Sequence, residues 1–72
     1  MERTELLNEL SNILKIPVEN ISGFEQLGAT PSWDSFAHVE IMLLLEKEFN
    51  VELNEESMNE FSSMDRILKI TD

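Results

Sequence analysis

The chain has 72 residues, no cysteine and a formal net charge of −10 at pH 7, from 15 acidic and 5 basic side chains. This length fits one small domain, and the lack of cysteine excludes disulfides and thiolate metal sites, so apolar packing must hold the fold together. The negative charge disfavours nucleic acids and anionic membranes as partners and favours basic protein surfaces, although from charge alone the plainer interpretation is that it keeps a small monomer soluble.

No apolar run approaches the roughly 18 residues that a membrane-spanning helix needs. The first five residues, Met1 to Glu5, are too acidic for a signal or transit peptide. There is also no internal repeat and no sign of a domain boundary. We therefore expect a single cytoplasmic domain over residues 1–72 that does not insert into membranes.

Residues 4–16 carry apolar side chains at three- and four-residue spacing, which predicts an amphipathic helix with Thr4 as its N-cap. The apolar stripe consists of Leu6, Leu7, Leu10, Ile13 and Leu14. Pro17 ends this helix, and residues 17–33 form a long loop with both glycines of the chain. The apolar residues expected to pin this loop to the core are Ile21, Phe24 and Leu27. A loop of this length in so small a domain is more often functional than accidental.

Residues 36–49 give the strongest helical pattern, with a broad apolar face and several acids outside it. The apolar face is formed by Phe36, Val39, Met42, Leu43, Leu45 and Phe49. Ile41 and Leu44 widen it, which predicts a central helix with neighbours on several sides. The acids that must lie largely outside this face include Glu40, Glu46 and Glu48.

Asn54, followed by two glutamates, is typical of an N-cap, and a short helix is expected to run from it through Phe61. A last helix starts around Ser63. Its inward stripe consists of Met64, Ile67, Leu68 and Ile70. No segment has a convincing strand pattern, so the predicted fold class is all-α: a small four-helix bundle with three main helices, one short helix and a long first loop.

Ser35 lies where the long loop ends and the second predicted helix begins. A hydroxyl at this place is expected to be exposed beside the positive end of the helix dipole, where a covalently attached phosphate is well accommodated. Taken alone, a serine at a helix start is usually a cap. The negative charge of Asp34 before it interacts favourably with the same helix dipole.

Other chemistries find little support in the sequence. There is no glycine-rich phosphate loop, no cluster of His or Cys and no calcium-loop pattern, so we expect no metal site. His38, one turn after Ser35, is expected to be an exposed residue. By itself it does not supply the base and oxyanion hole of a serine hydrolase.

These features together resemble the acyl carrier protein family over essentially the whole chain. The likeness is carried by Asp34-Ser35-Phe36, by Val39-Glu40, by Leu45 to Phe49 and by Leu27-Gly28 upstream. It implies that a phosphopantetheinyl transferase attaches 4′-phosphopantetheine, taken from coenzyme A, to the Ser35 hydroxyl. Asp34 would belong to the surface that this transferase recognises.

The resemblance also implies a carrier and not an enzyme. Acyl intermediates would be held as thioesters on the arm and delivered to partners of fatty acid, polyketide or related biosynthesis. In the family, acids at the positions of Glu40, Glu46 and Glu48 dock on basic surfaces of acyl-activating enzymes, acyltransferases and synthases. Solvation of an amphipathic helix is the plainer explanation of these acids.

Several residues depart from the pattern of the housekeeping fatty-acid carriers. Ala37 stands where an acid is typical, Lys47 interrupts an acidic run, Phe36 replaces a leucine, and Trp33 precedes Asp-Ser. This form resembles discrete carriers of specialised pathways. Trp33 itself is expected to anchor the loop on the bundle, because a large aromatic side chain gains most from burial.

Two other functions stay open at this point. The first is an aminoacyl or peptidyl carrier of a nonribosomal type of pathway, which would use the same serine and arm. The second is a noncarrier acidic helical module that binds other proteins and has no need of a hydroxyl at Ser35. Incubation with coenzyme A and a transferase distinguishes the second from the carriers.

Overall fold

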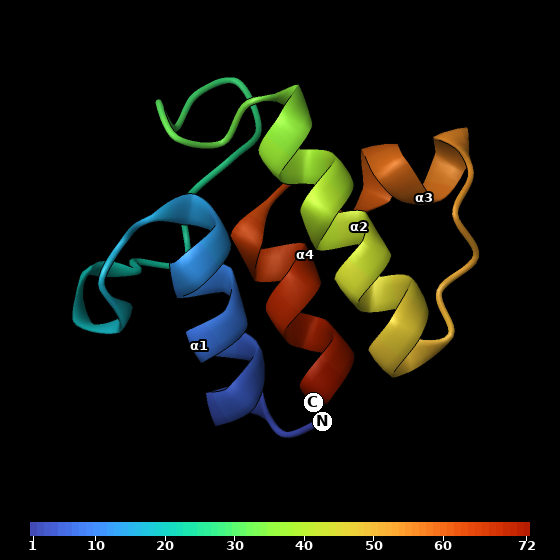
Figure 1. Cartoon of the computed structure of the whole chain (residues 1–72), viewed down its shortest axis with the longest axis horizontal. Coiled ribbons are helices and arrows are strands. Elements are labelled where there is room, and N and C mark those ends of the chain that lie inside the picture. Colours follow the sequence, from blue (N-terminus) through green and yellow to red (C-terminus); the bar gives the residue numbers. More distant parts are fainter.

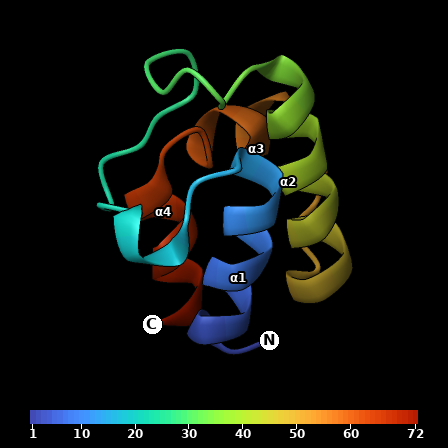
Figure 2. The ribbon, with the colours of Figure 1, turned by 60° about the vertical axis from the view of Figure 1, so that its left-hand side comes forward.

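The computed structural model describes residues 1–72. It contains α-helices and short 3₁₀-helices joined by loops, and no strands. The elements are α1 (Arg3–Leu14), η1 (Val18–Asn20), α2 (Ser35–Phe49), α3 (Glu55–Glu60), α4 (Met64–Leu68) and η2 (Lys69–Thr71). Helices α1, α2 and α4 lie side by side, with α1 running opposite to the other two, and α3 crosses beside the first half of α2 (Figures 1 and 2). The prediction of an all-α fold with three main helices and one short helix is confirmed.

One apolar core fills the space between the three main helices. Its eleven buried residues are Leu6, Leu10 and Leu14 of α1, Trp33, Ala37, Ile41, Met42 and Leu45 of α2 and its approach, and Met64, Ile67 and Leu68 of α4. The four-residue spacing in α1 places its three leucines on one line of the helix. Trp33 is completely buried, so the prediction that it anchors the loop is confirmed.

The first helix begins earlier and ends earlier than the sequence pattern predicts. Glu2 is its N-cap, in a capping box in which the Glu5 carboxylate accepts the Glu2 backbone N–H at 3.2 Å. Thr4 lies inside the helix, so its prediction as N-cap is wrong. The helix stops at Leu14 because Lys15 adopts a left-handed backbone with φ 58°, which closes the last turn.

The long loop is held to the bundle through its backbone. The Leu27 N–H donates to the Ser62 carbonyl and the Met64 N–H donates to the Glu25 carbonyl, both at 2.9 Å, so this stretch pairs with the junction of α3 and α4. Phe24 is 86% exposed, and its predicted contact with the core is wrong. In an extended stretch neighbouring side chains point to opposite sides, and here Glu25 takes the inward side.

Glu25 organises the tight turn that precedes this pairing. Its carboxylate accepts the Ser22 N–H at 2.8 Å, the Ser22 hydroxyl at 2.9 Å and the Gly23 N–H at 3.0 Å. Burial of the carboxyl group raises its pKa, but these hydrogen bonds outweigh burial, and the pKa lies below its ordinary value. The ionised form of Glu25 is therefore the one that stabilises the turn.

This arrangement predicts acid sensitivity of the loop. Because the pKa of Glu25 is lower in the folded state, its stabilising contribution is complete above its ordinary value of 4.5 and is lost as the pH falls through the folded pKa. Glu25→Gln should lower the free energy of unfolding at pH 7 by about 1–2 kcal/mol and should flatten the decline of that free energy within this pH range. Denaturant unfolding from pH 7 to pH 3 measures both effects. Glu19→Gln, an exposed change in η1, is the matched control, and equal behaviour of the two variants would contradict the assignment.

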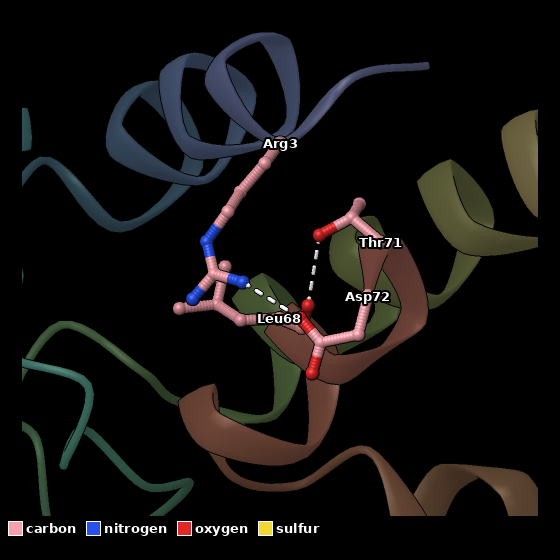
Figure 3. A network of polar contacts seen from close by, with 4 residues as sticks. All are labelled: Arg3, Leu68, Thr71 and Asp72. Carbon is pink, nitrogen blue, oxygen red and sulfur yellow. Dashed lines mark hydrogen bonds and ion pairs between the residues drawn. The ribbon is translucent and has the colours of Figure 1, made fainter.

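The two ends of the chain meet at one end of the bundle, opposite to the start of α2 (Figures 1 and 2). The Arg3 guanidinium donates to the Asp72 carboxylate at 3.1 Å, and the Thr71 hydroxyl donates to the Leu68 carbonyl at 2.9 Å (Figure 3). Such an exposed ion pair contributes only about 0–1 kcal/mol. Its position shows that the termini do not crowd Ser35.

Candidate functional site

Ser35 is the first residue of α2, and its side chain is exposed. The N-cap is Asp34, whose carboxylate accepts the Ala37 N–H at 2.8 Å while its carbonyl accepts the His38 N–H at 3.0 Å. The capping function that a serine commonly performs at a helix start is thus performed by its neighbour. The interpretation of Ser35 as a cap is wrong, and its hydroxyl lies at the positive end of a helix of 15 residues.

The acids predicted to lie outside the apolar face do so. Glu40, Glu46 and Glu48 are all exposed on α2. None of them forms an ion pair, since the one salt bridge of the molecule joins Arg3 to Asp72. Three carboxylates are therefore free to meet basic groups from another molecule.

Three apolar residues of α2 lie between Glu40 and Glu46 on the helix surface and not in the core. Phe36 is 74%, Leu43 48% and Val39 44% exposed, so their assignment to the buried face is wrong. At 100° per residue they form one exposed stripe, with Ser35 and Glu46 along one edge and Lys47 and Glu40 along the other. We call these three side chains the α2 stripe. The helix is apolar nearly all round, and packing on α1 and α4 covers only one side of it.

His38 is buried, with 3% exposure, and its predicted position on the surface is wrong. Its Nδ1 lies 3.2 Å from the indole Nε1 of Trp33, and its Nε2 lies 2.7 Å from the carbonyl oxygen of Met58. An indole N–H can only donate, so Nδ1 is the acceptor and the imidazole proton is on Nε2, which donates to Met58. His38 therefore ties the end of the loop, the first turn of α2 and α3 together.

A hollow of about 320 Å³ opens between the end of α1 and the start of α2. It is lined by Asn12, Ile13, Lys15, Ser32, Asp34, Phe36, Ala37 and Glu40. Lys15 is the cation in this lining. Nothing in the sequence pointed to Lys15, because a lysine after a helix end is an ordinary surface residue and its approach to α2 depends on how the two helices pack.

No group of three or more His, Asp or Glu side chains lies close enough together to hold a metal ion. None of the helices combines the length and the apolar character that crossing a membrane requires. Comparisons with protein-family models, with curated proteins and with solved structures find no match to this chain. The geometry around Ser35 is thus the basis on which a function can be proposed.

Proposed function

We propose that the protein is an acyl carrier whose Ser35 hydroxyl bears a 4′-phosphopantetheine arm. The observation that carries this proposal is the exposed Ser35 at the first position of α2, with the capping role filled by Asp34. A hydroxyl in this position is free to react. A phosphate attached to it stands beside the backbone N–H groups and the positive dipole end of a long helix, which favours the negative charge.

The attachment itself is a phosphoryl transfer catalysed by a separate transferase. The Ser35 oxygen forms a bond to the phosphorus on the pantetheine side of the coenzyme A diphosphate. The bond from that phosphorus to the bridging oxygen breaks, 3′,5′-adenosine bisphosphate leaves, and the hydroxyl proton passes to a base of the transferase. The product is a phosphodiester on Ser35.

The exposed start of α2 fits this group by charge. The positive end of the α2 dipole favours the phosphate, and the largely exposed ring of Phe36, next to Ser35 in the chain, offers apolar surface. When bound, the arm supplies a thiol that holds cargo as a thioester. The chain has no cysteine of its own, so its residues contribute binding and orientation but no thiol chemistry.

Partner binding is assigned to the exposed side of α2. The α2 stripe offers apolar contact area next to Ser35, and Glu40, Glu46 and Glu48 offer negative charge to basic surfaces. Exposed charges of this kind mainly raise the rate of encounter and leave complexes short-lived. This suits delivery between the transferase, acyl-activating enzymes, acyltransferases and synthases.

Intact mass spectrometry tests the proposal directly. The protein is incubated with coenzyme A and a phosphopantetheinyl transferase of broad specificity, and a single addition of the phosphopantetheinyl mass is expected. If no transferase modifies it, the carrier proposal is wrong. The α2 stripe and its acids then favour a noncarrier module that binds basic proteins. If it is modified, loading by amino-acid-activating enzymes instead of acyl-activating enzymes identifies an aminoacyl or peptidyl carrier.

Glu40→Lys is expected to slow modification by the transferase without unfolding the protein. The change replaces attraction by repulsion on the turn that follows Ser35, which corresponds to about 1 kcal/mol, or about fivefold in rate, at low salt. The difference should shrink at about 1 M salt, where charges are screened within about 3 Å. Initial rates from mass spectra at both salt concentrations measure it.

Glu9→Lys is the matched control, because Glu9 is an exposed glutamate in the middle of α1. Both variants change the net charge equally, so only a local effect separates them. Equal rates for wild type and both variants at low salt would show that the acids of α2 serve solubility alone.

A further inference from the structure

We infer that the hydrogen bond between the side chains of Trp33 and His38 positions Ser35 for modification. We call it the Trp33–His38 bond. The inference depends on the proposed function, and it makes His38 a positioning residue that acts on the start of α2 through Trp33.

The two bonded residues lie on either side of the attachment point in the chain. Trp33 is completely buried and His38 is 3% exposed, whereas all three residues from Asp34 to Phe36 are exposed. Side chains that stand in water contribute little packing to hold their backbone in place. The turn that carries Ser35 therefore depends on its buried ends and on its hydrogen bonds.

Few hydrogen bonds of the backbone hold this turn. The first N–H groups of a helix have no partner within the helix. Those of Ser35 and Phe36 have none elsewhere in the chain, and the Asp34 carboxylate accepts the N–H of Ala37. The Trp33–His38 bond is therefore a second restraint on the helix start, besides the Asp34 cap.

The orientation of the His38 ring is fixed from both sides. The indole Nε1 of Trp33 lies 3.2 Å from Nδ1 of His38, and the two ring centroids are 6.0 Å apart. The indole N–H donates, so the imidazole proton is on Nε2, which donates to the Met58 carbonyl at 2.7 Å. The imidazole cannot turn over without breaking both bonds.

Trp33 is itself part of a hydrogen-bonded turn of the long loop. Its N–H donates to the Thr30 carbonyl at 2.9 Å, and its carbonyl accepts the Gly28 N–H at 3.1 Å. The Trp33–His38 bond thus joins this turn to α2 across Ser35. Attack of the Ser35 oxygen on phosphorus needs a defined geometry, and a transferase that binds only the ordered helix start has a lower apparent affinity when that start opens.

Two substitutions of His38 separate the bond to Trp33 from the bond to Met58. In His38→Asn, Oδ1 is as many bonds from Cα as the imidazole Nδ1, so it can accept the indole N–H, while the bond to Met58 is lost. In His38→Gln, Nε2 is as many bonds from Cα as the imidazole Nε2, so it can donate to Met58, while the bond to Trp33 is lost. Each variant loses one hydrogen bond, so a merely structural role of His38 predicts similar effects for both.

Hydrogen exchange of the Ala37 amide, which donates to Asp34, measures opening of the helix start. In His38→Gln this exchange should be about two- to tenfold faster than in wild type, the factor that corresponds to the loss of one hydrogen bond. In His38→Asn it should stay close to the wild-type rate. The fluorescence of Trp33, the one tryptophan of the chain, should shift to longer wavelength in His38→Gln alone.

Modification by the transferase should separate the two variants in the same order. With coenzyme A present, kcat/KM should be about two- to fivefold lower for His38→Gln than for His38→Asn. Thermal unfolding establishes a temperature at which both variants are folded. Trp33→Phe removes the indole donor independently, and it should behave as His38→Gln does.

The outcomes separate this inference from the function on which it depends. Equal exchange of the Ala37 amide in the two His38 variants would overturn it, whatever the transferase does. Equal values of kcat/KM in spite of unequal exchange would also overturn it and would leave the carrier proposal intact. If wild type is never modified, the carrier proposal is wrong, and with it the role of His38 in modification.

Discussion

Replacing Ser35 by alanine is expected to abolish attachment of phosphopantetheine and to leave the fold unchanged. The Ser35 side chain is exposed, and Asp34 caps the helix, so no structural role is lost. Alanine is the best helix former, and the free energy of unfolding should change by less than about 0.5 kcal/mol. Intact mass after incubation with the transferase measures the first effect, and thermal unfolding followed by circular dichroism measures the second.

Two neighbouring variants make this result specific. Ser32→Ala removes another hydroxyl, three residues before Ser35 in the chain, and should still gain the full mass. Asp34→Ala removes the cap, at a cost of about 1 kcal/mol, and should be modified more slowly but completely. A mass gain by Ser35→Ala, or a peptide map that places the group on another residue, would contradict the assignment of Ser35.

The helices themselves were predictable because their apolar residues recur at helical spacing. The start and end of α2 and the N-cap Asn54 of α3 agree with the sequence pattern to within a residue. At α1 the pattern failed, because glutamate is an unusual N-cap and the Glu2–Glu5 box competed with the more ordinary Thr4. Local capping alternatives of this kind differ by too little energy to be ranked from sequence.

Which side of α2 faces the core could not be predicted. Apolar residues surround the helix, so Phe36, Val39 and Leu43 fit an inward face as well as an outward one. The choice depends on where α1 and α4 pack, which is a property of the whole chain. The exposure of Ser35 followed from its place at a loop end, but the exposed apolar surface that follows it on α2 did not.

The burial of two polar side chains was another feature that could not be predicted from the sequence. A sequence gives no partner for Glu25 or His38, and an isolated charged or polar residue is normally on the surface. Both are buried because each finds its hydrogen-bond partners: Glu25 within its own turn, and His38 across three segments. Removing the hydrogen bonds of His38 is expected to have a large effect on the free energy of unfolding.

His38→Leu is expected to lower the free energy of unfolding by about 1–3 kcal/mol, because the buried Trp33 indole N–H and the Met58 carbonyl lose their partner. A core of this size supplies only about 3–5 kcal/mol in total, so the variant should be close to unfolding at room temperature. The loss of stability should be larger in α3 than in α1. Backbone amides of α3 should exchange with solvent faster than those of α1, since the bond to Met58 links α3 to α2. Denaturant unfolding and hydrogen exchange measure the two effects.

A double-mutant cycle with Trp33→Phe separates the hydrogen bond from simple packing. Phe retains most of the apolar ring and removes the indole N–H, so no donor is left unpaired when His38 becomes Leu. The two changes together should therefore cost about 0.5–3 kcal/mol less than the sum of the single changes. Additive effects would show that His38 acts only by filling space. A coupled result would establish that the His38 imidazole joins the end of the long loop to the first turns of α2 through the Trp33 indole.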